Sequence, residues 1–236
     1  MLLESTLSSA LAVILTLALP ATAAARPSPE RATPKLSLTA QLRLADTAVD
    51  RYKLLPNDED FIYDFNKSAS PFANAQTFPA LVGSGTSLSV SALPGCGMSF
   101  LHLHPRATEL FALTSGRVHT EMVPEGSVLD SEGKQRVIKT DLTPGMMTIF
   151  PAGSFHTQVN PDCEPAAFAA ALTSEDFGFS FVANQTYALS DDVIAATFGK
   201  SVAGEDIDTV RNSIPGGLLI MVEECLSKCG KEKRRV

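Results

Sequence analysis

The chain has 236 residues, of which 44% are hydrophobic, so it can bury one sizeable core, and nothing in its composition suggests disorder or a repeat array. Its formal net charge of −7 at pH 7 disfavours a nucleic-acid-binding surface, because such surfaces depend on clustered Lys and Arg. The one basic cluster runs from Lys228 to Arg235, and we interpret residues 231–236 as a solvated basic tail.

The first residues predict a secretory signal. The apolar run from Ala10 to Leu19 is too short to span a bilayer, and Pro20 and a series of small residues follow it, as signal peptidase requires. We therefore expect residues 1–25 to be cleaved and the protein to be secreted, extracellular and free of the membrane. Because the segment before the run carries Glu4 and no Lys or Arg, an uncleaved anchor or a buried N-terminal helix is the alternative.

Residues 26–37 are rich in Pro, Ser and Ala, which predicts a flexible lead. From Leu38 the apolar positions Leu42, Ala45 and Val49 repeat at helical spacing, which predicts one amphipathic helix that ends before Pro56.

The period then changes to short β-prone runs separated by Gly, Pro, Asn and Asp. These runs cover residues 61–65, 77–82, 87–92, 110–113, 118–123, 135–142, 148–150, 157–159, 167–172 and 179–183. Many short strands with close turn signals indicate an antiparallel sandwich or barrel rather than βαβ units.

The last fifth of the chain becomes helical again. Ser190 is a plausible N-cap, and Asp191 and Asp192 follow it in the first turn of a helix that runs to about Phe198. A final helix is expected from residue 218 to 228, closed by Gly230. We expect these helices to pack on the barrel or on a neighbouring subunit.

Sequons and cysteines agree with a secretory route. Asn66 and Asn184 begin the two sequons, so both are candidate glycosylation sites. The four cysteines fit two disulfides in an oxidising compartment, and none of their spacings resembles a zinc knuckle or ribbon.

Three of the four histidines predict a metal site. His102 and His104 stand at alternate positions of a β-prone run, so their imidazoles share one face of a strand. Glu109 follows across a segment able to turn the chain back, and His156 comes from a separate strand after a tight turn. Three imidazoles and one carboxylate make a mixed N/O site that leaves two positions of a six-coordinate ion open.

Together these residues form a two-part motif that resembles the motifs of germin-like cupins, close to the spherulin group of secreted fungal and slime-mould proteins. His102 to Glu109 and Gly116 fit the first motif. The second motif is matched at every position by Gly145, Pro151, Gly153, His156 and Asn160. The resemblance implies an all-β, cupin jelly-roll β-barrel with peripheral N- and C-terminal α-helices, a single cupin type-1 domain over residues 38–230.

The resemblance also implies Mn²⁺ as the cofactor, with Fe²⁺ or Zn²⁺ as other candidates, and an oxidoreductase acting on a small oxygenated substrate or on superoxide. A non-enzymatic matrix, wall or encystment protein with a structural metal is the first alternative, and a tailoring cupin of secondary metabolism is the second. Germin-like proteins pair their barrels and often stack three such dimers, so we expect a dimer or hexamer.

Two positions depart from the germin pattern. Cys96 replaces the first glycine of the first motif, with glycines on either side of it. Ser99 stands where the oxalate-oxidising germins carry an Asn thought to hold the substrate, which weakens the expectation of oxalate as substrate.

Three further polar residues receive secondary roles. We expect Asn160 to support the ligands from behind or to form a turn, and His119 to be an ordinary strand residue. Arg106 can equally make a structural or subunit contact or meet an anionic substrate.

A disulfide between Cys96 and Cys163 is expected from strand register. If the strands of His102 and His156 are antiparallel neighbours, as in cupins, opposed residue numbers have a constant sum, and both pairs give nearly the same sum. Cys225 and Cys229 would then bridge each other or remain thiols. The competing interpretations leave Cys96 and Cys163 unpaired or pair each with the C-terminal helix.

Overall fold

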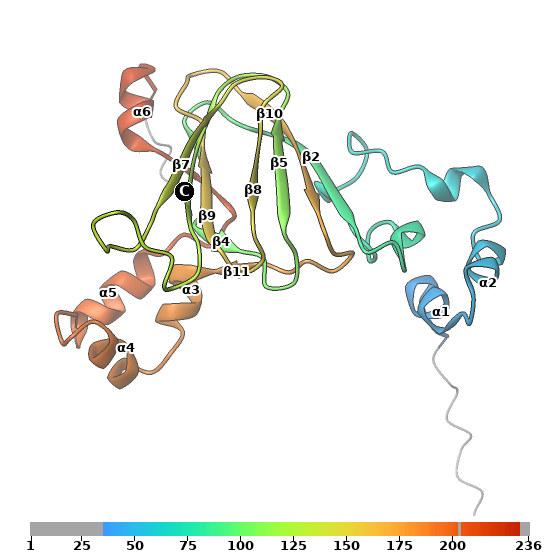
Figure 1. Ribbon diagram of the computed structural model, residues 1–236, viewed down its shortest axis with the longest axis horizontal. Coiled ribbons are helices and arrows are strands. Elements are labelled where there is room, and N and C mark those ends of the chain that lie inside the picture. The colour runs from blue at the N-terminus through green and yellow to red at the C-terminus, as the bar shows by residue number, and fades with distance from the viewer. Residues whose placement is uncertain (1–34, 203, 232–236) are drawn as a thin grey trace, which may run out of the picture. The chain divides into compact units, whose positions relative to one another are not determined.

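The computed structural model describes residues 35–202 and 204–231 (Figure 1). The predicted signal segment, most of the predicted lead and the tail after residue 231 lie outside the described residues. Within the described residues, no helix is long and apolar enough to cross a membrane.

The first predicted helix is divided in two. Helix α1 runs from Leu38 to Leu44 and α2 from Ala48 to Lys53. The break occurs because Ala45 is extended and the Thr47 side chain caps α2 by accepting a hydrogen bond from the Asp50 N–H at 3.2 Å. Thr and Asp favour such caps over helix interiors, so local chemistry outweighs the helical spacing of the apolar residues.

Two antiparallel sheets make up the β-rich part of the chain, as predicted (Figure 1). The five-stranded sheet contains, in order, β1 (Phe72–Ala73), β2 (Ser87–Leu93), β10 (Ala166–Leu172), β5 (Glu109–Leu113) and β8 (Met147–Phe150). The seven-stranded sheet contains β11 (Ser180–Phe181), β4 (His102–Leu103), β9 (Phe155–Val159), β3 (Gly97–Ser99) and β12 (Leu219–Met221), with β6 (Val118–Val123) on β9 and β7 (Ile138–Leu142) on β6.

Two predicted strands near the N-terminus are wrong. No strand forms at 61–65, where the 3-10 helix Asp58–Phe61 ends, and the segment 77–82 contains the 3-10 helix Pro79–Leu81. In the first, the side chain of Asp60 accepts a hydrogen bond from the Asn57 N–H at 2.9 Å. In the second, Pro79 fixes the first turn and has no N–H to give to a sheet.

The C-terminal region contains more elements than predicted. Helix α4 (Asp191–Thr197) lies where it was expected, whereas α3 (Val182–Tyr187) and α5 (Glu205–Ser213) were missed. The predicted last helix begins as strand β12 and becomes helical only at α6 (Glu223–Lys228), where Gly230 follows with a φ of 62°. The apolar run 218–222 is compatible with either a helix or a strand. It forms a strand because residues 219–221 pair with β3.

The main core lies between the two sheets. Its buried members are Leu93, Phe111, Leu113, Val118, Met122, Leu142, Phe150, Ala166 and Ala170. Burying a Phe side chain of this kind contributes about 2–3 kcal/mol. Gly116 closes the turn before β6 at a φ of 81°, and a Cβ there would lie 2.7 Å from the Ala166 Cα, so this motif position requires glycine.

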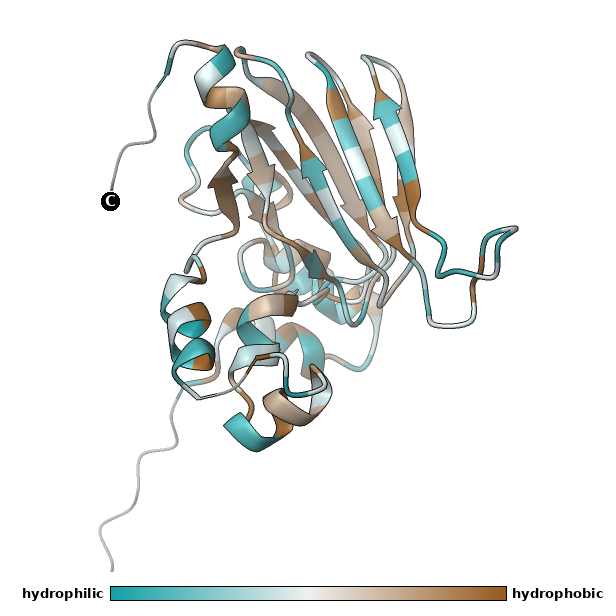
Figure 2. Ribbon diagram, turned by 90° about the vertical axis from the view of Figure 1, so that its left-hand side faces the viewer, coloured by the Kyte–Doolittle hydropathy of each residue, from teal (hydrophilic) through white to brown (hydrophobic). Residues whose placement is uncertain are grey.

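The outer faces of the two sheets differ in character. Figure 2 shows teal, hydrophilic bands along strands nearest the viewer. On the outer face of the seven-stranded sheet, Lys139 pairs with Glu121 at 2.8 Å, and His119 pairs with Asp141. The outer face of the five-stranded sheet carries alanines and larger apolar side chains such as Val90 and Ile149, which are exposed.

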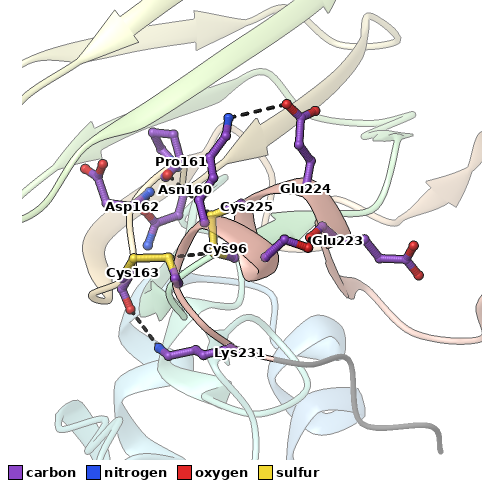
Figure 3. Close-up of a disulfide and its surroundings, with 12 residues drawn as sticks. Cys96, Asn160, Pro161, Asp162, Cys163, Glu223, Glu224, Cys225 and Lys231 are labelled. Carbon is purple, nitrogen blue, oxygen red and sulfur yellow. Dashed lines mark hydrogen bonds and ion pairs between the residues drawn. A yellow bond between two sulfur atoms is a disulfide. The ribbon is translucent and has the colours of Figure 1, made fainter.

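The predicted disulfide between Cys96 and Cys163 is wrong. Cys96 is bonded to Cys225 and Cys163 to Cys229, with Cα–Cα distances of 5.4 and 5.6 Å (Figure 3). Both bridges therefore join the barrel to α6, which was the competing interpretation.

The strand adjacency behind that prediction is nevertheless correct. His102 lies opposite His156, and further along, the Cys96 N–H donates to the Asp162 carbonyl at 2.8 Å. Cys96 adopts a left-handed φ of 63° in the turn that opens β3, and α6 packs beside this turn. Register fixes which residues are neighbours, but the backbone conformation at Cys96 and the position of α6 decide where the side chain bonds.

Candidate metal centre

The two sheets bring four predicted ligand residues together. His102 begins β4 and pairs with His156 of β9, and His104 follows β4 directly. Glu109 begins β5, which belongs to the other sheet. All four are buried, and their ligand atoms lie within 4.8 Å of one another, so the group can hold a metal ion. An ion there would join the two sheets.

Backbone carbonyls orient all three imidazoles. The Nδ1 atoms of His102, His104 and His156 lie 2.7, 2.8 and 2.9 Å from the carbonyl oxygens of Phe100, Gly178 and Ser154. A carbonyl has no hydrogen to donate, so each Nδ1 carries a proton, and in the neutral form of each ring the lone pair is on Nε2. This is the tautomer in which histidine binds a metal through Nε2.

The lone pairs face a carboxylate. The Nε2 atoms of His104 and His156 lie 2.9 and 3.2 Å from Glu109 Oε2. Because the ring protons are on Nδ1, the two Nε2 atoms and Glu109 Oε2 are all acceptors, with no hydrogen between them. Three acceptors this close are stable only when a positive charge lies among them. A metal ion supplies that charge without protonating the rings, so the residues present fit a bound cation.

The titration of the site agrees with this arrangement. Burial, and then the neighbouring His156 and His104, lower the pKa of His102 from 6.5 to about 3. Burial alone would raise the pKa of Glu109, but the contacts of its carboxylate with the rings of His104 and His156 outweigh burial and lower that pKa from 4.5 to about 2. At neutral pH the site therefore holds a neutral His102 and an ionised Glu109, the protonation states that metal ligands require.

The loop at residues 176–178 supports His104. Arg106 donates to the Asp176 carbonyl at 2.8 Å and to its carboxylate at 2.9 Å, and Gly178 in the same loop accepts the bond from His104. Arg106 therefore has the structural role of the two that the sequence left open. Phe179 packs its ring against His104, with centroids 4.8 Å apart.

Gln158 is a site residue that the sequence analysis missed. It lies two positions after His156 on β9, so it shares the inward face of that strand, and alternation along the strand was the signal that could have revealed it. Its Nε2 lies 3.5 Å from Glu109 Oε1. Ser99 accepts a hydrogen bond from the Gln158 backbone N–H at 2.9 Å and donates its own hydroxyl to Gln158 Oε1.

A cavity of about 230 Å³ lies beside the site and is lined by three of the four candidate ligand residues, His102, His104 and Glu109. Ser99, Gln158 and Glu109 contribute its polar wall. The remainder is mostly apolar, with Phe111, Leu172 and Phe179 among the lining side chains. Of the described residues that line the cavity, none is Lys or Arg.

Asn160 and His119 take no direct part in the site. Asn160 is fully buried, and its side-chain hydrogen bonds hold the turn around Leu93, Pro94 and Glu164. It is therefore a turn residue rather than a direct support of the ligands. His119 lies on the outer face of the seven-stranded sheet, as expected of an ordinary strand residue.

The predicted glycosylation sites lie in different environments. Asn66 is exposed in the loop before β1. Asn184 lies within α3, where its side-chain amide donates to the Pro215 carbonyl at 3.4 Å and its Oδ1 is buried without a partner.

Comparison with known proteins identifies the family of this chain. Residues 54–206 match the sequence model of the family described as Cupin. The chain belongs to the cupin family. Its relatives include Spherulin-1A of Physarum polycephalum, 32% identical over 82% of this cupin and 79% of the spherulin. Germin-like protein 8-2 of Oryza sativa subsp. japonica is 31% identical over 53% of this chain and 56% of its own.

Solved structures confirm the cupin fold. An oxalate oxidase in complex with the substrate analogue glycolate superimposes with a TM-score of 0.57 at 16% identity, covering 68% of this cupin and 84% of that chain. At this identity the likeness shows the fold alone. The predicted jelly-roll barrel with peripheral helices is thus confirmed.

Proposed function

We propose that this cupin is a secreted protein that binds one divalent metal ion, manganese, through His102, His104, Glu109 and His156. The observation that carries the proposal is the common orientation of the three imidazoles, each with Nδ1 on a carbonyl and Nε2 available. The carboxylate suits manganese, whereas the three imidazoles also suit iron and zinc, so Fe²⁺ and Zn²⁺ are its competitors.

We infer further that the metal serves an oxidoreductase reaction on a small oxygenated substrate or on superoxide. When bound, the ion would supply a Lewis-acidic, redox-active centre with positions open to substrate. The cavity of about 230 Å³ is below the range of about 300–1,000 Å³ that is usual for drug-sized ligands, which favours a substrate of few atoms.

The chain's own residues define what the cavity admits. Gln158 offers amide hydrogens beside Glu109, and Ser99 holds the Gln158 oxygen, so the side-chain amide cannot turn over without losing that bond. Phe111, Phe179 and Leu172 give the rest of the wall an apolar surface. Because the described lining lacks Lys and Arg, a dianion such as oxalate would depend on the metal for its charge partner, which favours superoxide or a substrate of lower charge.

A non-enzymatic role with a structural metal is the second candidate. It is favoured by the similarity to spherulins over most of the chain and by the ligand arrangement, in which an ion would join the two sheets. In that case the metal would raise the free energy of unfolding without turning over a substrate.

One experiment separates the two candidates. The secreted protein is purified, its metal content is measured, and superoxide and oxalate assays are run on the same sample and on the His104→Ala variant. Manganese with superoxide consumption that the variant loses supports the oxidoreductase. Manganese at full occupancy with neither activity rejects it in favour of the structural role.

We also infer a homo-oligomer, a dimer or a hexamer built from dimers, that forms through the outer face of the five-stranded sheet. The register places ten outward apolar residues in adjacent rows of β2, β10, β5 and β8: Leu88, Val90, Ala92, Ala167, Ala169, Ala171, Leu110, Ala112, Met147 and Ile149. An apolar face of this extent on a soluble protein marks an interaction site.

A second copy of the chain is the occupant that fits this face. The alanines of β10 are small, and larger side chains stand on the strands beside them, so Met147 and Ile149 of one copy can pack on the alanine row of the other. Residues 26–34 and 232–236 consist largely of proline, polar and charged residues, so a second apolar face matches this surface better than either segment does.

A further inference from the structure

The last described segment, residues 218–231, forms a strap along the barrel. Its strand β12 is an edge strand that pairs with β3, and the flanking backbone bonds run from Phe100 N–H to the Leu218 carbonyl at 2.6 Å and from Val222 N–H to the Cys96 carbonyl at 2.9 Å. As an edge element it can separate from β3 while the other strand pairs remain intact.

This strap forms part of the cavity wall. Leu218 and Leu219 line the cavity together with Ser99 and His102, and Leu219 lies opposite Ser99 in the strand register. Movement of the strap would therefore open the cavity beside the proposed metal ligands to solvent.

Two disulfides hold the strap at its far end. Helix α6 has six residues, too few to be stable by itself. Cys225 within it and Cys229 directly after it each belong to one bridge. The buried cluster beneath it consists of Cys96, Cys225 and Leu226, with Met221, Val222 and Cys229 packed against them. The cysteines are thus much of what fixes α6 to the barrel.

The two bridges differ in access to solvent and lie in contact. Cys163 is exposed, whereas Cys96 is fully buried and Cys225 is buried. The Sγ atoms of Cys96 and Cys229, which belong to different bridges, are 3.5 Å apart (Figure 3). Lys231 donates to the Cys163 carbonyl at 3.1 Å and brings positive charge to the outer bridge, which favours a thiolate there.

We propose that the two disulfides form a latch that a dithiol reductant can open. The dithiol first reduces the outer bridge, Cys163–Cys229, and thiol–disulfide exchange then breaks the inner bridge, Cys96–Cys225. A thiolate of the dithiol bonds to Cys163 Sγ, and Cys229 leaves as the thiolate. Cys229 then bonds to Cys96 Sγ, and Cys225 leaves. The second thiol of the dithiol releases Cys163, so that one oxidised dithiol, a Cys96–Cys229 bridge and thiols at Cys163 and Cys225 remain. A second dithiol then bonds to Cys229 Sγ, Cys96 leaves as the thiolate, and the second thiol of that dithiol releases Cys229, so that two oxidised dithiols and four cysteine thiols remain and the strap is no longer bonded to the barrel.

The exchange step is tested with two matched variants. Cys163→Ser frees the Cys229 thiol beside the inner bridge, whereas Cys229→Ser frees Cys163 instead. Trypsin cleaves after Lys228, between the two cysteines of the helix, so acid-quenched peptide mapping can distinguish the pairings. We expect a mixture of Cys96–Cys225 and Cys96–Cys229 in Cys163→Ser and Cys96–Cys225 alone in Cys229→Ser. Cys96–Cys225 alone in both variants would overturn the relay.

The opening of the strap is tested by amide hydrogen exchange on the full chain with and without a dithiol. We expect exchange to rise about tenfold or more in residues 97–100 and 218–231, while β5, β6 and β9 keep their protection. A variant with all four cysteines replaced by Ser should exchange rapidly in the strap whether or not the dithiol is present. Unchanged exchange in the strap, or equal loss across the barrel, would overturn the latch.

Neither measurement needs a bound metal or a substrate, so failure of the latch and failure of the proposed function can be told apart. If the latch and the proposed function are both correct, the wild-type protein should release Mn²⁺ to a chelator about tenfold faster after reduction. In the four-serine variant the rate of release should not depend on the dithiol. Equal rates in the reduced and oxidised wild-type protein would show that the strap does not guard the cavity.

Discussion

His102 and His156 lie directly opposite each other on the neighbouring antiparallel strands β4 and β9, and their ring centroids are 4.3 Å apart. Two imidazoles this close and this buried cannot both be charged without strong repulsion. Their side chains therefore make the metal-free centre sensitive to acid.

The metal-free protein should lose stability as the pH falls below 6.5. His102 binds a proton near pH 6.5 when unfolded but only near pH 3 when folded, so protons favour the unfolded state between these values. The free energy of unfolding should fall by about 1.4 kcal/mol per pH unit in this window from His102 alone. Urea titrations at pH 7, 6, 5 and 4 measure it.

Glu109 adds a second loss at lower pH. Its folded pKa of about 2 is below the ordinary 4.5, so its ionised form contributes stability above pH 4.5 that disappears as the pH falls towards 2.

The His102→Gln variant tests the first of these two losses. It should flatten the dependence of the free energy of unfolding on pH above pH 5, and an unchanged dependence would show that His102 is not buried in its neutral form.

The oligomer should dissociate when charge is placed on the outer face of the five-stranded sheet. Val90→Glu and Ile149→Glu each bring a carboxylate into the proposed contact, where its desolvation is unfavourable, although both side chains are exposed in one copy. Light scattering at micromolar concentration should show the wild type as a dimer or hexamer and both variants as smaller species.

The matched control for this test is Val137→Glu, which changes an exposed valine outside that face. It should keep the wild-type mass. A monomeric wild type, or dissociation by Val137→Glu as well, would argue against this interface.

A glycan is expected at Asn66 rather than at Asn184. Asn66 lies exposed in a loop, whereas the Asn184 amide is engaged with Pro215 and its oxygen is buried. Mass spectrometry of protein secreted by a eukaryotic host should show a mass loss of one glycan in Asn66→Gln and none in Asn184→Gln. The reverse pattern would mean that α3 is not formed when the chain is modified.

Short-range sequence signals predicted much of this fold and of the site. The strand at 118–123 has the predicted bounds, and the grouping of the four candidate ligands agrees with the alternation at His102 and His104 and with the glycine-containing turn before His156. The segments 61–65 and 77–82 failed because capping by Asp60 and the missing N–H of Pro79 are stronger local effects than β-propensity.

Long-range packing explains the remaining errors. Whether residues 219–221 are strand or helix depends on β3, and the partner of Cys96 depends on where α6 lies, neither of which the local sequence encodes. Gln158 was missed because its role depends on Ser99 and Glu109, which come from two other strands.

Metal content in ligand and control variants tests the central claim most directly. Wild-type protein, His104→Ala, His156→Ala and His119→Ala are dialysed against metal-free buffer and measured by elemental analysis, with circular dichroism to confirm folding. The account predicts about one manganese ion per chain in the wild type and in His119→Ala, and retention lowered at least about tenfold in the two ligand variants. Full occupancy in both His104→Ala and His156→Ala would contradict it.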